Sequence, residues 1–200
     1  MRRTKSTRHA DVRERRALRR VWKRAPVGVN VTRSMQHGKG SQLFVLFVAC
    51  AAVFVWVTGL TLPNLVASHF GAEGAANGFM PRSFYIGFML VVIIGLPALL
   101  VVVTWFALGR SSARINLPNR DYWLAPERRT ETLAFLRISI IWFGVLLVTF
   151  LCYAHWLVVR ANESQPVRLA ESWFIGGLVV FLVATLIWLK VLFGRFRRRA

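Results

Sequence analysis

Four long apolar runs, separated by short polar segments, dominate the hydropathy pattern of the chain. They cover residues 43–62, 84–108, 138–159 and 173–189. Each is close to the roughly 20 residues that a helix needs to cross about 30 Å of hydrocarbon, and none alternates as a half-buried strand does. In lipid a helix satisfies its own backbone hydrogen bonds. The pattern therefore predicts an all-α integral membrane protein with four transmembrane helices, the last extended to about residue 193 by a snorkelling Lys190.

The flanking segments are basic. Residues 1–41 carry 13 Lys and Arg against Asp11 and Glu14, and their charges interrupt any apolar face. We therefore predict a disordered arm, with room for a short basic helix over residues 11–23. The predicted organisation is the arm (1–41), a membrane domain (42–193, with spans at about 43–62, 84–108, 138–159 and 173–193) and a basic tail (194–200). No small-x-small cleavage motif closes the first run, which predicts a retained signal anchor.

The charge distribution predicts the topology. Of the 27 Lys and Arg residues, 24 fall in the arm, in the segment 109–137 and in the C-terminal segment from Lys190 onward. By the positive-inside rule these segments, and so both termini, are cytoplasmic in a bacterial inner membrane. A chain that is 56% apolar with a net charge of +19 is not typical of a soluble domain. Basic segments beside a membrane favour contact with anionic lipid, and we expect no nucleic-acid partner.

The predicted external loop, residues 62–79, contains the first group of candidate site residues. Its glycines suit tight turns, and Asn77-Gly78 is a strong turn signal. The histidine either hydrogen-bonds the backbone of the loop and fixes its shape, or serves a ligand, a proton or a partner. A metal site needs more ligands than this histidine, the loop glutamate and His155 supply. The candidates are His69, Phe70, Glu73, Gly74, Asn77 and Gly78.

The same loop carries a resemblance to a known family. Its Leu62-Pro63, Val66, His69-Phe70, Gly74 and Gly78-Phe79 resemble the signature of a bacterial membrane domain of unknown function. That domain forms the N-terminal part of SdpI-type immunity and signalling proteins, where the signature links the first two transmembrane helices. Ala67 and Asn77 depart from the usual residues of the pattern. The resemblance covers about residues 43–103, and it implies the domain and an immunity or signalling role.

The predicted cytoplasmic loop contains the second group. Pro118-Asn119 indicates a turn, and Pro126 suits the first turn of a helix that leads into the third span. The aromatic pair of this loop either anchors an interfacial connector at the lipid headgroups or forms a docking surface for a cytosolic partner. The candidates are Asn116, Pro118, Asn119, Asp121, Tyr122 and Trp123.

The apolar runs themselves contain no Asp, Glu, Lys or Arg. Ion-coupled transporters and small drug exporters depend on such residues, and no Ser–His, Cys–His or paired-Asp arrangement suggests an enzyme. Cys50 and Cys152 are interpreted as buried small hydrophobes, and no cofactor is expected. The pairs Gly87/Gly95 and Gly176/Ala184 predict close helix packing.

The expected function is therefore non-enzymatic: sensing, immunity or envelope interaction through the two loops, with a protein partner or a homo-oligomer. The alternative is a small oligomeric permease or channel subunit that uses backbone carbonyls freed near Pro97.

Overall fold

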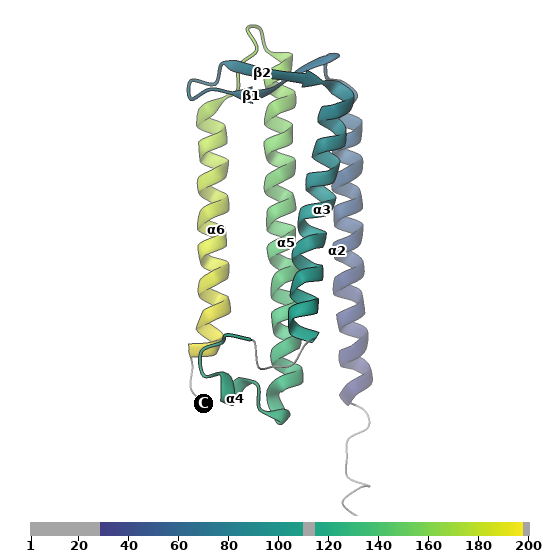
Figure 1. The fold of residues 1–200 in the computed structure, drawn as a ribbon, viewed down its shortest axis with the longest axis vertical. Helices are drawn as coiled ribbons and strands as arrows, with labels where there is room; N and C mark the ends of the chain where they lie inside the picture. The colour runs from purple at the N-terminus through teal and green to yellow at the C-terminus, as the bar shows by residue number, and fades with distance from the viewer. Residues whose placement is uncertain (1–28, 110–114, 198–200) are drawn as a thin grey trace, which may run out of the picture. The chain divides into compact units, whose positions relative to one another are not determined.

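The computed structural model describes residues 29–109 and 115–197, and within them four helices are long and apolar enough to cross a membrane. These are α2 (Val29–Gly59, apolar from Gly40), α3 (Arg82–Gly109), α5 (Pro126–Glu163) and α6 (Glu171–Arg197) (Figure 1). The expectation of four membrane-spanning helices is confirmed at this level, and the chain has the character of a multi-pass membrane protein.

Several helix boundaries differ from those predicted. Helix α2 begins at Val29, inside the segment predicted to be disordered, and the rest of that arm, residues 1–28, lies outside the described residues. Helix α5 begins at Pro126 and runs unbroken into the third span, as Pro126 had indicated. Helix α6 continues to Arg197, into the predicted tail. Hydropathy finds only the lipid-covered part of a helix, and polar turns that continue it at no steric cost are missed.

The compact unit Lys39–Ala200 contains the bundle, and α5 lies at its centre. Helices α2, α3 and α5 meet around Val55, Ile93 and Val148, which are fully buried. Close approach is made at Gly144, where an added Cβ would lie 2.9 Å from the ring of Phe44. Helix α6 packs against α5 on one side, and none of its membrane-spanning window is buried.

The glycines predicted to mediate helix packing do not do so inside this chain. A Cβ added at Gly87 or Gly176 would meet nothing within 4 Å, and one at Gly95 would meet only Val91 of its own helix. Helices α2 and α3 instead approach each other closely at Gly59, which faces Ile86, and α2 and α5 do so at Gly144. Spacing along one helix does not show which face the neighbouring helix covers, and the prediction was wrong for that reason.

The loop between α2 and α3 is a β-hairpin that the sequence did not predict. Strand β1 (Leu65–Phe70) pairs antiparallel with β2 (Ala76–Pro81), with irregular register around His69. The turn lies at Gly71–Ala75, where the Gly71 N–H donates to the Ala75 carbonyl and Gly74 has a φ of 75°. Asn77-Gly78, predicted as a turn, lies within β2. A Cβ at residue 78 would come within 3.0 Å of His69 Cβ, so this glycine provides room for a cross-strand side chain.

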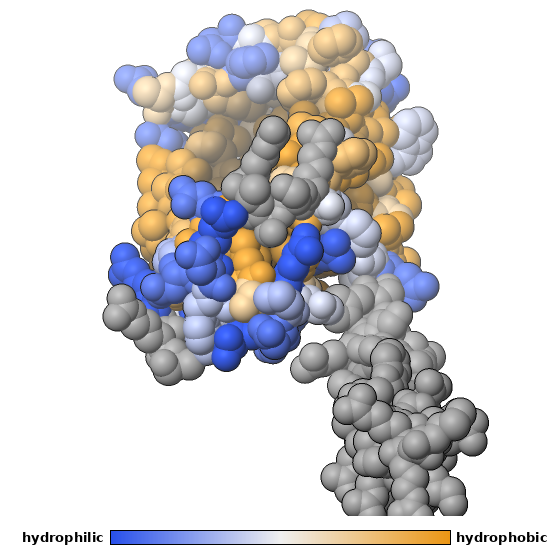
Figure 2. All heavy atoms as spheres, turned by 60° about the horizontal axis from the view of Figure 1, so that its bottom comes forward, coloured by the Kyte–Doolittle hydropathy of each residue, from blue (hydrophilic) through white to orange (hydrophobic). Residues whose placement is uncertain are grey.

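The opposite end of the bundle carries the short helix α4 (Arg120–Trp123). It follows the turn predicted at Pro118-Asn119, where Asn119 adopts a left-handed conformation with φ 53°. Figure 2 shows polar and charged residues gathered at this end, beside the apolar sides of the bundle. The bundle therefore has a hairpin end and an α4 end, separated by the lengths of its helices (Figure 1).

Candidate functional site

A buried polar cluster lies inside the bundle just below the hairpin. His155 of α5 is fully buried, and its two ring nitrogens lie 2.8 Å from Thr58 Oγ1 of α2 and 2.9 Å from the Tyr85 hydroxyl of α3. The Tyr85 ring stacks on the imidazole, and the Phe54 ring meets it edge-on. One histidine therefore joins three helices by hydrogen bonds and by ring contacts.

The hydrogen bonds of this cluster have a defined direction. The Phe54 carbonyl can only accept, so the Thr58 hydroxyl donates to it, at 2.6 Å. That hydroxyl has a single hydrogen, and it must therefore accept from Nε2–H of His155. In the neutral imidazole Nδ1 is then the acceptor of the Tyr85 hydroxyl proton. The chain of bonds runs from Tyr85 through His155 and Thr58 to Phe54, and it leaves no polar atom of the imidazole without a partner.

Seven residues beyond His155, the side chain of Asn162 holds the first strand of the hairpin. Its Oδ1 accepts from the Ala67 N–H at 2.9 Å, and its Nδ2 donates to the Ala67 carbonyl at 3.0 Å. Nδ2 also donates to the Val158 carbonyl of its own helix at 2.9 Å. The side-chain amide thus takes the place that a third strand would have beside β1. Neighbouring Val66 and Ala67 are fully buried, with Val66 packed among Leu62, Tyr85, Ile86 and Val159.

The segment between α5 and α6 fixes the turn of the hairpin. Arg168 Nε donates to the Glu73 carbonyl at 2.9 Å, and the Leu169 N–H donates to the Gly74 carbonyl at 2.8 Å. A Cβ at Gly74 would collide with the Leu169 carbonyl, so only glycine fits there. The hairpin is therefore attached along β1 and at its turn.

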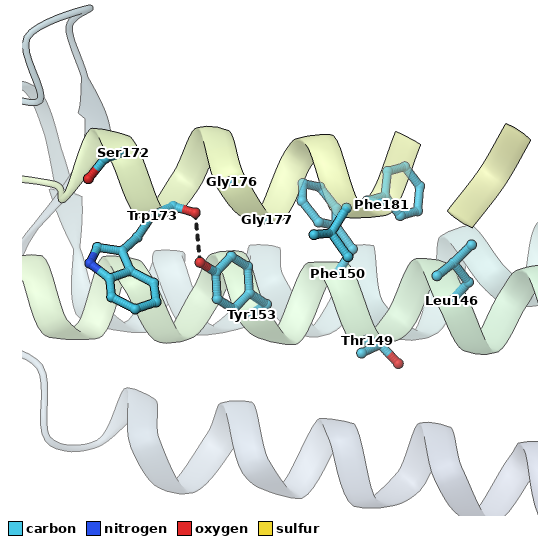
Figure 3. A pocket seen from close by; sticks show the side chains of 10 residues that line it. Leu146, Thr149, Phe150, Tyr153, Ser172, Trp173, Gly176, Gly177 and Phe181 are labelled. Carbon is cyan, nitrogen blue, oxygen red and sulfur yellow. Dashed lines mark hydrogen bonds between the residues drawn. The ribbon is translucent and has the colours of Figure 1, made fainter. Parts of the chain in front are cut away.

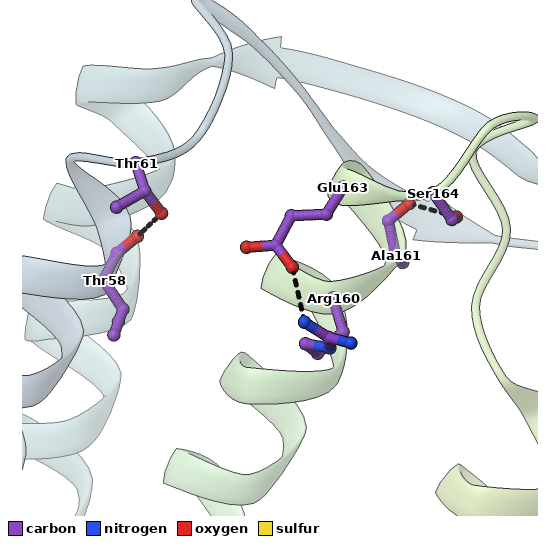
Figure 4. A network of polar contacts seen from close by, with 6 residues as sticks. All are labelled: Thr58, Thr61, Arg160, Ala161, Glu163 and Ser164. Atoms are coloured by element: carbon purple, nitrogen blue, oxygen red, sulfur yellow. Dashed lines mark hydrogen bonds and ion pairs between the residues drawn. The ribbon is translucent and has the colours of Figure 1, made fainter.

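Local polar contacts close the helix ends around this site (Figure 4). The Thr61 hydroxyl donates to the Thr58 carbonyl at the end of α2, and the Ser164 hydroxyl donates to the Ala161 carbonyl at the end of α5, both at 2.7 Å. Such bonds satisfy carbonyls that a helix end leaves without an intrahelical partner. Arg160 and Glu163 form an exposed ion pair at 2.9 Å.

The predicted external candidates lie on this hairpin, and the structure separates them into exposed and supporting residues. His69 is exposed, and Nδ1 of its ring lies 3.1 Å from the Ser68 hydroxyl; the backbone partner considered from the sequence is replaced by a side chain. Glu73 and Asn77 are exposed as well, whereas Gly74 is buried. Phe70 and Gly78 are half-buried. The exposed apolar side chains beside them are Leu65 and Phe79.

The candidates of the loop predicted to be cytoplasmic separate in the same way at the α4 end. Asn119 Nδ2 and Trp123 Nε1 both donate to the Phe196 carbonyl near the end of α6, at 3.1 and 3.2 Å. The Phe196 ring is fully buried and meets the Trp123 ring edge-on. Thr132 of α5 donates to the Trp123 carbonyl at 2.8 Å. The loop is therefore tied to α5 and to α6.

The remaining candidates of that loop make no such contact with α6 in the described part of the chain. Asn116, Pro118 and Asp121 are exposed, and Tyr122 is half-buried under the guanidinium of Arg128, which lies 4.0 Å from the ring centroid. Of the predicted aromatic pair, Trp123 thus contacts α6, and Tyr122 contacts Arg128 of α5.

Sequence reasoning missed most of the supporting residues. The sequence pattern does not single out Thr58, Tyr85 and Asn162, and it indicates His155 as a possible metal ligand or as a base near Cys152. In the described part of the chain no three His, Cys, Asp or Glu side chains lie close enough to hold a metal ion. A usable signal was present, since a histidine in an apolar run must find hydrogen-bond partners on neighbouring helices. Which helices supply them depends on tertiary packing.

Comparison with known proteins gives one result. No curated protein and no solved structure matches the chain. A family model matches residues 45–95, which include Thr58, the whole hairpin and Tyr85, while His155 and Asn162 lie beyond the matched segment. The expected resemblance over about residues 43–103 is confirmed as far as the domain itself: residues 45–95 of this chain match the domain of unknown function DUF1648.

Proposed function

We propose that this chain is a non-enzymatic multi-pass protein of the bacterial inner membrane. In this proposal its hairpin is external and docks a protein or peptide partner, as in sensing or immunity. The single observation that carries the proposal is the attachment of β1 to α5 by Asn162, which makes the hairpin a preformed surface. Its exposed Leu65, His69 and Phe79 offer an apolar and aromatic contact area with one titratable group.

The same helix supports a route from this surface to the cytoplasm. Helix α5 binds the hairpin through Asn162, and at its other end its Thr132 binds the Trp123 carbonyl. Glu131, beside Thr132, also pairs with Arg195 of α6 at 2.8 Å. A shift of α5 would therefore change the contacts of both loops, as signalling by a rigid element requires.

Topology is the first test of this proposal. Reporter fusions at Gly74 and Ser164 should report an external location, and fusions at Asn119 and Ala200 a cytoplasmic one, because 24 of the 27 Lys and Arg lie on one side of the predicted spans. A cytoplasmic report at Gly74 would overturn an external hairpin.

Docking is tested by photo-crosslinking in cells. A photoreactive residue at Phe79 should give a protein adduct of defined mass, and that adduct should weaken when Asn162→Leu detaches the hairpin. The matched control is the same photoreactive residue at Val102, which is similarly exposed but lies on α3 inside the membrane span. Identical adducts from both positions would contradict a specific docking surface.

The alternative of a small oligomeric permease or channel subunit makes a different prediction. Purified protein in liposomes would then conduct a solute, and Pro97→Ala would change the rate if carbonyls freed by that proline line the path. The interaction role predicts no flux above that of empty liposomes.

A further inference from the structure

A groove of about 630 Å³ lies between α5 and α6 in the hairpin half of the bundle (Figure 3). Leu146, Phe150 and Tyr153 line it from α5, and Ser172, Gly176 and Phe181 are among the residues that line it from α6. We propose that this groove, here called the α5–α6 groove, binds one acyl chain of a phospholipid from the leaflet at the hairpin end. This inference does not depend on the proposed docking role.

The hydroxyl groups along the depth of the groove have no proton left to donate to an occupant. The Thr149 hydroxyl donates to the Val145 carbonyl of its own helix, and the Tyr153 hydroxyl donates to the Trp173 carbonyl. Neither hydroxyl is left with a free proton to offer a ligand. The other side chains along the depth of the groove are apolar, and Gly176 of α6, where an added Cβ would meet nothing within 4 Å, leaves room in it. An occupant must therefore be apolar along its length.

The length of the groove matches a single leaflet. Along α6 it extends from Ser172 to Phe181, which is about 14 Å at 1.5 Å per residue. This is close to half of the roughly 30 Å hydrocarbon core. Toward the middle of the bundle, the Phe150 and Phe181 rings stack with centroids 4.6 Å apart, and Leu146 lines the groove one turn of α5 further on. A helix of a second copy would follow α6 over its whole length, whereas an acyl chain ends near the midplane.

The mouth of the groove suits the ester region of a lipid. In Figure 3, Ser172 and Trp173 lie at the end of the groove nearer the hairpin. Within the described part of the chain, the Ser172 hydroxyl and the Trp173 indole N–H have no protein partner, and Trp173 is exposed. Both can donate to ester carbonyls at the headgroup level, where Trp is enriched in membrane proteins. The groove thus presents donors at its mouth and apolar walls below.

Photolabelling with a defined lipid tests this assignment. The full chain is reconstituted in vesicles of phosphatidylethanolamine and phosphatidylglycerol that contain phosphatidylethanolamine with a diazirine in one acyl chain. We expect labelling concentrated on peptides around Phe150 and Phe181, and saturable by unlabelled phosphatidylethanolamine. Labelling that follows surface exposure alone, without saturation, would overturn the proposal.

Two glycine substitutions provide a matched pair. Gly176→Leu fills the groove and Gly87→Leu adds the same side chain on α3, and in both places an added Cβ meets nothing within 4 Å. Gly176→Leu should lower labelling of the groove peptides severalfold, and Gly87→Leu should leave it unchanged. Val180→Trp, which fills the groove from an exposed position, replaces Gly176→Leu if that variant fails to fold. Unchanged labelling in a folded groove-filling variant, or crosslinks from the groove to a second copy of the chain, would refute acyl-chain binding.

Discussion

Replacing Asn162 by leucine tests whether α5 holds the hairpin. The substitution keeps a side chain of similar size and removes its amide. Ala67 then loses the acceptor of its N–H and a donor to its carbonyl, and this residue is fully buried. The third bond, to the Val158 carbonyl, matters less, because that carbonyl lies within α5 and has an intrahelical partner as well.

The free-energy cost of this substitution follows from the two backbone groups of Ala67 that lose their hydrogen-bond partners. A buried donor or acceptor left without a partner costs roughly 1–3 kcal/mol, so the attachment of the hairpin should weaken by about 2–6 kcal/mol. At the lower limit of about 2 kcal/mol, the equilibrium constant for opening of the hairpin rises about 30-fold, since each 1.4 kcal/mol is a factor of ten.

Hydrogen exchange in nanodiscs, followed by mass spectrometry, measures this opening. Peptides that cover residues 65–81 should exchange faster in Asn162→Leu, while peptides from the middle of α3 and α5 keep their protection. The matched control is Asn77→Leu, the same chemical change at an exposed position of β2, which should alter stability by less than about 0.5 kcal/mol. Unchanged hairpin exchange in a folded Asn162→Leu protein would refute the attachment.

Other substitutions probe the remaining contacts. Gly74→Ala should lower the melting temperature, since its positive φ costs about 1–3 kcal/mol in other residues and its Cβ meets the Leu169 carbonyl; Gly71→Ala, which makes only ordinary contacts, should be milder. Tyr85→Phe leaves Nδ1 of the fully buried His155 without its donor and should cost about 1–3 kcal/mol in thermal unfolding, with a larger loss for His155→Leu. Trp123→Ala should speed proteolysis near Phe196 compared with Tyr122→Ala, because the Trp123 side chain contacts Phe196 by a hydrogen bond and by its ring. His69→Ala should change the melting temperature little, because the hydrogen bond between His69 and Ser68 is exposed. A fall in melting temperature as large as that of Gly74→Ala would show that His69 fixes the shape of the loop.

The helices were predictable from the sequence because lipid imposes one requirement on every spanning segment. An apolar run near 20 residues must satisfy its own backbone, so the existence of α2, α3, α5 and α6 followed from hydropathy alone. The start of α5 was predictable too, because Pro126 suits the first turn of a helix and fits there without losing a hydrogen bond.

The hairpin and its attachment were not predictable in the same way. A loop with three glycines suggested turns, and the strongest local signal, Asn77-Gly78, lies in a strand. What stabilises β1 is Asn162, far along the chain, and a tertiary hydrogen bond of this kind leaves no periodic trace in the sequence. His69, the most conspicuous titratable residue of the loop, lies at the surface, whereas His155 makes the buried contacts.

The distribution of these contacts bears on the domain that residues 45–95 match. Its two helices and hairpin contain Thr58, Ala67 and Tyr85, and each of the three hydrogen-bonds a side chain of α5. Two helices and a hairpin alone would leave the Tyr85 hydroxyl and the Ala67 backbone without these partners, at a cost that hydrocarbon makes harder to offset. The two partners, His155 and Asn162, lie seven residues apart on α5, two turns along one face. In this chain α5 supplies both, and so the rigidity of the hairpin depends on residues outside the matched domain.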